Sequence, residues 1–269
     1  MVRSGGVHPV EPAKPAAAYR DYERARPGVR AFYRENHARQ TVEFVRGRHE
    51  AYFPLRRRRM GVFEAFDALA ELVDDSDPDL QLSQLDHALQ TAEALRAAGA
   101  PRWLVLTGFV HDLGKVLCLF GEPQWAVVGD TFPVGCAFDG RIVHADLFAA
   151  NPDARHPVYG TDDGIYAPGC GLDALLLSFG HDEYLYRVLR PYLSEPALAI
   201  VRYHSFYAWH DRRAYARFED ASDAAKLEAV RRFHSFDLYS KSERRPDWPA
   251  LRPYYEALVA EHLPETLQW

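Results

Sequence analysis

The segment from Trp103 to Phe120 constrains the fold more than any other, because it is almost entirely apolar. Pro101 stands where a helix would begin, and a helix of this composition is expected to be buried on most sides. Three ionisable side chains nevertheless lie within it: His111, Asp112 and Lys115. An ionised Asp in such a place is costly unless it is paired or binds a metal. The dipeptide His111-Asp112 therefore indicates either two polar side chains that hydrogen-bond each other or a metal site, and alone it leaves both open.

Helical periodicity recurs along most of the chain. Apolar residues are spaced by three and four positions in the segments 30–52, 60–73, 85–98, 172–178, 181–193, 195–206, 222–240 and 253–263. No βαβ alternation and no internal repeat is visible. We predict an all-α class: a flexible N-terminal tail at 1–18, rich in Pro and Ala, and one domain at 19–269. The stretch 121–170 is rich in Gly and Pro, and a loop of this length in a compact domain is usually functional.

Composition limits the partners. A net charge of -6 argues against nucleic acid as the main partner. Three cysteines give no disulfide framework, and no unbroken run of about 18 apolar residues predicts a membrane span. The first residues lack the apolar core of a signal peptide. We therefore expect a cytoplasmic protein without a membrane partner, acting as a monomer.

Further polar residues lie among apolar neighbours, each in a different predicted helix: His87, His181, His204 and Asp237. A single His of this kind is usually a core residue whose hydrogen bonds are satisfied. Together with His111 and Asp112 there are six such positions, and this number favours a metal centre. Four imidazoles and two carboxylates suit iron, manganese, zinc or nickel and exceed what one tetrahedral site needs. If one Asp bridges, the set serves two metals, and Asp112 is the natural bridge. We place the remaining histidines in tails, loops or polar faces, with His210 and His234 among them as spare candidates: His8, His37, His49, His144, His156, His210, His234 and His262.

Several motifs together resemble the myo-inositol oxygenase family, within the helical HD-domain superfamily. They are LVDDSDPD (72–79), HALQTAE (87–93), HDLGKVL (111–117), FGEPQWAVVGDTFPVGC (120–136), FGHDEYLYRV (179–188), RYHSFYAWH (202–210) and FDLYSK (236–241). The resemblance runs from about Tyr19 to Trp269. The stretches 79–86 and 137–165 differ from animal members of the family, which bears on stereoisomer preference and leaves the ligands intact.

This resemblance implies an HD-type helical bundle with an N-terminal lid and a mixed-valent Fe(II)/Fe(III) pair. One iron would be held by His87, His111, Asp112 and Asp237, and the other by Asp112, His181 and His204. It implies that myo-inositol binds the second iron through two hydroxyls and that O2 cleaves its ring to D-glucuronate. The implied substrate contacts are Arg20, Asp74, Lys115, Gly129, Asp130, Ser205 and Lys241, with Tyr33 in the lid.

Lys115 and Asp112 are the residues to which the resemblance gives catalytic roles. The chain has four lysines among 32 basic residues, so a Lys that persists has a reason to be Lys. A compact ammonium at Lys115 or Lys241 can reach one oxygen and keep a substrate hydroxyl deprotonated.

Three other functions remain open at this point. A metal-dependent phosphohydrolase of the same superfamily would also need cations near its metals, but Asp74 and the loop 129–133 favour a polyol over a phosphate. A relative that oxidises another diol or an aminophosphonate is compatible with the same residues. A non-enzymatic scaffold with a degenerate metal site is disfavoured because all six ligands are present.

Overall fold

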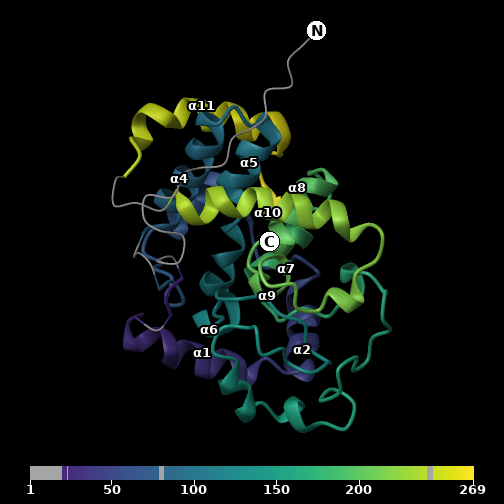
Figure 1. The fold of residues 1–269 in the computed structure, drawn as a ribbon. Coiled ribbons are helices and arrows are strands. Elements are labelled where there is room, and N and C mark those ends of the chain that lie inside the picture. The colour runs from purple at the N-terminus through teal and green to yellow at the C-terminus, as the bar shows by residue number, and fades with distance from the viewer. Residues whose placement is uncertain (1–19, 23, 79–81, 241–244) are drawn as a thin grey trace.

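The computed structural model describes residues 20–22, 24–78, 82–240 and 245–269 (Figure 1). Its α-helices are α1 (Pro27–Arg39), α2 (Val42–Tyr52), α3 (Val62–Ala68), α4 (Gln84–Ala97), α5 (Arg102–Val110), α6 (Gln124–Val127), α7 (His181–Leu189), α8 (Glu195–Tyr203), α9 (Tyr207–His210), α10 (Asp223–Tyr239) and α11 (Trp248–His262). Shorter 3-10 helices are η2 (Leu113–Phe120), η3 (Ala145–Ala150), η4 (Pro152–Arg155), η5 (Leu172–Ala174) and η6 (Ala216–Phe218). The all-α prediction is confirmed, while the predicted tail at 1–18 lies outside the described residues.

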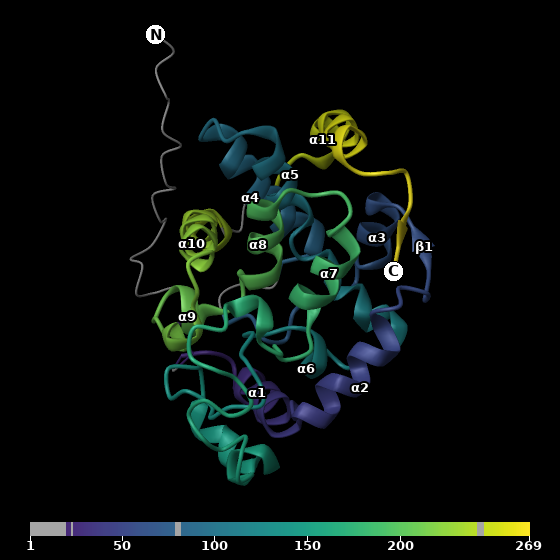
Figure 2. The ribbon, with the colours of Figure 1, turned by 90° about the vertical axis from the view of Figure 1, so that its right-hand side faces the viewer.

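Five α-helices pack together at the centre of the described part of the molecule. Helix α4 packs on α5, α10 packs on both α4 and α8, and α7 packs on α8 and η2. In Figure 1, α11 lies above this group and α1 and α2 lie below it; Figure 2 shows α7 and α8 between α10 on one side and α3 on the other. Polar side chains that face inward from these helices therefore meet in the core.

The apolar segment 103–120 is largely buried, but it is not one regular helix. Helix α5 ends at Val110, and the chain continues from Leu113 as the 3-10 helix η2. Residues three apart eclipse each other in a 3-10 helix, so the tightening brings Lys115 over Asp112. By length and composition, Arg102–Phe120 could cross a membrane, and 78% of its most apolar stretch is buried inside the protein. Burial of this kind is typical of a core helix.

Two predicted helices are divided or shortened. The segment 30–52 forms α1 and α2, because Thr41 interrupts it and its side chain accepts a hydrogen bond from the Phe44 amide at 3.1 Å. This is the usual N-cap arrangement, in which a new helix begins. The segment 60–73 contains only α3, because Met60 instead pairs with Leu267 in a two-stranded antiparallel ribbon. That ribbon, β1 (Arg59–Met60) with β2 (Leu267–Gln268), was not predicted.

Other predicted boundaries also differ. The helix predicted at 172–178 is wrong beyond the short η5, because Leu177 forms a bridge with Pro133 and the Ser178 amide donates to the Phe132 carbonyl at 2.7 Å. Helix α11 begins five residues before the predicted Pro253, at an N-cap formed by Asp247. The core helix predicted at 85–98 is confirmed by α4 within one residue at each end.

Candidate metal centre

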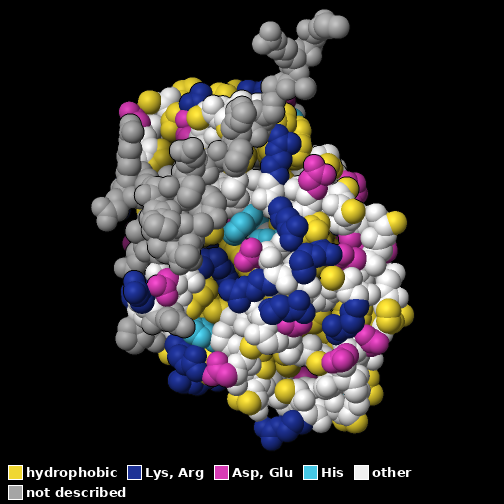
Figure 3. Space-filling model, viewed as in Figure 1, with side chains coloured by type: hydrophobic (Ala, Val, Ile, Leu, Met, Phe, Trp, Pro, Cys, Tyr) yellow, Lys and Arg dark blue, Asp and Glu magenta, His cyan; other side chains and the backbone are white. Residues whose placement is uncertain are grey.

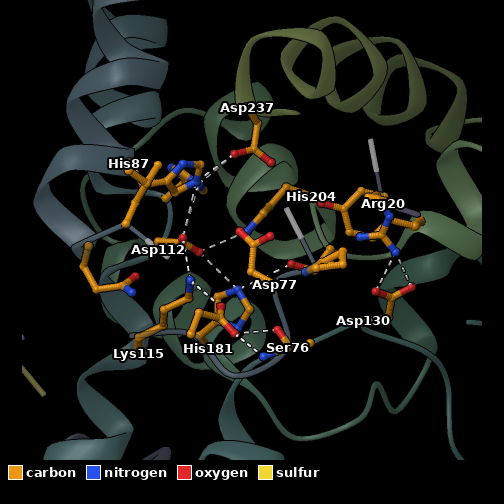
Figure 4. A pocket seen from close by; sticks show the side chains of 18 of the residues that line it. Arg20, Ser76, Asp77, His87, Asp112, Lys115, Asp130, His181, His204 and Asp237 are labelled. Carbon is orange, nitrogen blue, oxygen red and sulfur yellow. Dashed lines mark hydrogen bonds and ion pairs between the residues drawn. The ribbon is translucent and has the colours of Figure 1, made fainter. Parts of the chain in front are cut away.

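Five places in the fold supply the six predicted metal ligands (Figure 4). They come from α4 (His87), the α5–η2 junction (His111 and Asp112), the first residue of α7 (His181), the residue after α8 (His204) and the last turns of α10 (Asp237). All six line one small cavity of about 80 Å³, which has room for a few waters or a small polar molecule. Residues far apart in the sequence therefore meet as the sequence analysis predicted.

Among the described residues, two groups could hold a metal ion, and His87, His111 and Asp112 form the first. The Oδ2 atom of Asp112 lies 3.7 Å from His87 Nε2 and 3.6 Å from His111 Nε2. Asp237 approaches the same two rings, with Oδ1 at 3.0 Å from His87 Nε2 and 3.3 Å from His111 Nε2. Two imidazoles and two carboxylates thus surround one position.

Asp112, His181 and His204 form the second group. Here Asp112 contributes its other oxygen, Oδ1, which lies 3.3 Å from His181 Nε2 and 3.5 Å from His204 Nε2. Each oxygen of one carboxylate therefore faces a different pair of imidazoles. This arrangement is the one expected of a residue that bridges two metal ions.

The geometry of the donor atoms suits metal ions, and this conclusion does not depend on any related protein. Three rings direct Nδ1 at a backbone carbonyl at 2.7 to 3.1 Å: His111 at Gly108, His181 at Val127 and His204 at Val201. With the proton on Nδ1, each Nε2 presents a lone pair to carboxylate oxygens. Asp237 Oδ1 is buried and accepts no hydrogen bond from the described residues, yet it faces Nε2 of His111, which is one of these three rings, and Nε2 of His87. A cation between these acceptors removes the conflict, and imidazole with carboxylate is a donor set that iron, manganese and zinc accept.

Lys115 is the buried cation beside the centre. Its Nζ lies 2.7 Å from Asp112 Oδ2 and 2.9 Å from Asp74 Oδ2. Burial would raise the pKa of the Asp112 carboxyl, but the charge of the adjacent Lys115 holds that pKa well below its usual range. The pKa of Asp74 is also lowered, because Lys115 and hydrogen bonds from Ser76 outweigh the effect of burial. Both carboxylates are therefore ionised at neutral pH and oriented toward the cavity.

The predicted substrate contacts border the same cavity. Arg20 forms a two-pronged ion pair with Asp130 at 2.7 and 2.9 Å, and its guanidinium lies 3.3 Å from the centre of the Tyr207 ring. Tyr33 donates to Asp130 at 3.2 Å. Gly129 has a φ of +95°, and a Cβ there would lie 3.0 Å from the Phe32 ring, so both backbone and space favour Gly.

One predicted contact, Lys241, lies outside the described residues, while Asp74, Lys115, Gly129, Asp130, Ser205, Arg20 and Tyr33 all line the cavity. The sequence analysis did not single out Asp77, Tyr22, Tyr207 or Asp182. Asp182 carries a signal in the sequence, since it directly follows a predicted ligand at the start of a helix. Tyr207 and Tyr22 carry none, because only the fold brings them beside Arg20.

Two histidines differ from their predicted placement. His37 and His210 are fully buried rather than on loops or polar faces. His210 does not border the cavity; its Nε2 donates to the backbone carbonyl of His204 at 2.9 Å. It therefore contacts the backbone of a predicted ligand and is not placed as a spare ligand.

Comparisons with known proteins agree with the geometry. A family model described as Myo-inositol oxygenase matches residues 26–269. Inositol oxygenase of Homo sapiens is 47% identical over 266 residues, which cover 96% of this chain and 93% of that protein. Inositol oxygenase 1 of Arabidopsis thaliana is 48% identical over 261 residues (93% and 84%), and inositol oxygenase of Danio rerio is 42% identical over 263 residues (95% of each). On this evidence the chain belongs to the myo-inositol oxygenase family.

Proposed function

We propose that this protein uses O2 to cleave the ring of myo-inositol to D-glucuronate, with two iron ions in the Fe(II)/Fe(III) state. The single observation that carries the proposal is the pair of His/Asp groups that share Asp112 at one cavity. The family relationship supports inositol as the substrate. Two iron ions, when bound, would supply the redox reactivity toward O2 that side chains lack.

The proposed reaction balances with one O2 per inositol. Opening the bond between two neighbouring hydroxyl-bearing carbons converts one to a carboxylic acid and the other to an aldehyde, which is a four-electron oxidation. One oxygen atom of O2 enters the product and the other leaves as water. No further reductant is consumed in the overall reaction.

The cavity suits an uncharged polyol. Inositol is a ring of hydroxyls, so its binding site needs many donors and acceptors close together. Ser205 provides them beside His181, Lys115 and Asp74 provide them beside Asp112, and Arg20 with Asp130 provides them elsewhere in the lining. The ammonium of Lys115, already beside Asp112, is placed to stabilise a substrate oxygen that has lost its proton.

The same cavity disfavours the phosphohydrolase alternative. Its carboxylates exceed its cations: Asp74, Asp77, Asp112, Asp130 and Asp237 border it, against Arg20 and Lys115. Both cations are engaged, Arg20 with Asp130 and Lys115 with Asp74 and Asp112. Neither described cation is therefore left to hold a phosphate, and Asp74, Asp77 and Asp130 would lie beside it.

The surface around the site differs in charge from the chain as a whole. The face in Figure 3 carries Lys and Arg side chains gathered across the middle of the view, where α9 and α10 lie in Figure 1, although the net charge is -6. A locally positive surface attracts an anion, such as the proposed product glucuronate, more strongly than a neutral substrate. Cytoplasmic location and a monomeric state remain predictions from the sequence.

The experiment that tests the function is a product and oxygen balance. Purified protein is loaded with Fe(II) and partly oxidised, and myo-inositol is added while O2 and glucuronate are measured. We expect one glucuronate per O2, and electron spin resonance should show a coupled Fe(II)/Fe(III) pair. Absence of O2 uptake, together with phosphate release from a phosphoester, would reject the proposal in favour of hydrolysis.

A further inference from the structure

Asp182 is a buried carboxylate beside the second metal group that no predicted role accounts for. Its side chain is 1% exposed. The Oδ1 atom lies 2.7 Å from His181 Nε2 and 3.5 Å from His204 Nε2. These are the same two nitrogens that face Asp112 Oδ1. A second negative charge is therefore held next to the position where the second ion would bind.

Hydrogen bonds on its other side connect Asp182 to the substrate contacts. Thr131, two residues after Gly129, donates its hydroxyl to Asp182 Oδ2 at 2.9 Å. The Ser205 amide donates to Oδ2 and the Ser205 hydroxyl to Oδ1, both at 3.3 Å. The Thr131 amide in turn donates to the Ser205 carbonyl at 2.9 Å. One carboxylate thus joins the loop after Gly129 to the residue that follows His204.

We propose that Asp182 is a positioning residue that couples the second metal group to the polyol-binding loop. Thr131 and Ser205 already donate hydrogen bonds to its two oxygens and hold the carboxylate beside the Nε2 atoms of His181 and His204. Its charge would stabilise a cation held by His181, His204 and Asp112, because a charge in a buried site is weakly screened and acts strongly at short range. Partners of this kind orient metal ligands, and their loss typically weakens metal binding by about 10- to 100-fold.

This inference rests on the metal centre of the proposed function, but its test measures metal binding and not turnover. Glu183 offers a matched control in the next position of the same helix. It is equally buried, and its carboxylate pairs with Arg202 at 2.5 Å and Arg187 at 3.1 Å, away from the imidazoles. A general loss of stability would therefore affect both variants, whereas the proposed role would affect only one.

The test is an anaerobic titration of Fe(II) into the metal-free full chain, without inositol. For Asp182→Asn we expect one of two binding steps to weaken by about 10- to 100-fold, with the other unchanged. For Glu183→Gln we expect both steps to match the wild type, with a lower melting temperature. In turnover, Asp182→Asn should raise the KM for inositol as well as lower kcat, because Thr131 and Ser205 lose their shared acceptor.

Two results would overturn the role of Asp182. One is wild-type affinity for both ions in Asp182→Asn; the other is equal weakening in Asp182→Asn and Glu183→Gln. If Asp182→Asn does not fold, Thr131→Val keeps the carboxylate but removes one hydrogen bond to it. That variant should weaken the same step by a few-fold, and unchanged binding in it would reject the inference. If Asp182→Asn weakens one binding step while the iron-loaded wild type leaves inositol unreacted, the inference stands and the proposed function is rejected.

Discussion

Gly114 lies where two ligand-bearing segments are in close contact, and replacing it with Ala should disable the second metal group. A Cβ built at Gly114 would lie 2.1 Å from the carbonyl oxygen of His181 and 2.7 Å from its carbonyl carbon. Both atoms belong to the backbone, so no side-chain rotation relieves the collision. Helix α7 must move away from η2, and His181 is its first residue.

The size of the movement follows from the contact. Ordinary van der Waals contact begins at 3.4 Å, so the oxygen has to retreat by about 1.3 Å from 2.1 Å. Overpacking of this kind costs about 1–3 kcal/mol in the free energy of unfolding. A displacement of about 1 Å in a catalytic group can reduce the rate by about 100-fold. We therefore expect Gly114→Ala to fold, to bind one ion normally, and to lose at least about 99% of glucuronate formation.

A second glycine provides the control. Gly47 lies on the exposed side of α2, and a Cβ there would meet none of the described residues within 4 Å. Gly47→Ala should raise the free energy of unfolding by about 0.5–1 kcal/mol, as in other helix interiors, and leave metal content unchanged. Urea denaturation and iron analysis of both variants make the comparison. If Gly114→Ala retained two ions and wild-type turnover, the steric argument would be wrong.

Three further predictions concern other parts of the molecule. Asp112→Ala should remove both ions, because each of its oxygens serves one group; iron analysis after desalting that found one ion held at full affinity would contradict the shared role. Lys115→Met should lower the stability of the metal-free protein in urea by about 3–5 kcal/mol, because Asp112 and Asp74 would lose their buried cation, and a loss under about 1 kcal/mol would count against this pairing. Burial lowers the pKa of His49 to about 4, with Arg187 adding to the effect, so the unfolded chain takes up a proton near pH 6.5 before the folded chain does. The stability that neutral His49 contributes is thus complete above about pH 6.5 and is lost as the pH falls toward 4. By pH 5 the free energy of unfolding should fall by at most about 2 kcal/mol, or roughly 1 kcal/mol after allowing for solvent screening. In urea melts at pH 7 and pH 5, His49→Gln should lose correspondingly less stability on acidification.

The metal centre could be located from the sequence because ionisable residues stand out within segments that are otherwise apolar. His111 and Asp112 interrupt an apolar segment, and His204 and Asp237 have apolar neighbours, so each is recognisable without knowledge of its partners. Periodicity likewise predicted α4 almost residue by residue. Local signals of this kind survive folding because the physical cost they report is a property of the segment itself.

Features that depend on distant partners were not predictable in the same way. The pairing of Met60 with Leu267 depends on two segments at opposite ends of the domain, and neither is strand-like alone. The change from α5 to a 3-10 helix after Asp112 depends on the packing of Gly114 against His181. The break at Thr41 was within reach, since Thr is a good N-cap residue, but apolar periodicity continues through it.

The sharing of Asp112 has a mechanical consequence. Helices that pack through side chains shift against one another by fractions of an ångström as the molecule vibrates, and the imidazoles here come from four different segments. The two oxygens of a carboxylate are joined by covalent bonds through one carbon and cannot drift apart. Asp112 would therefore limit how far two bound ions could move apart while the helices around it shift, because one side chain would contact both.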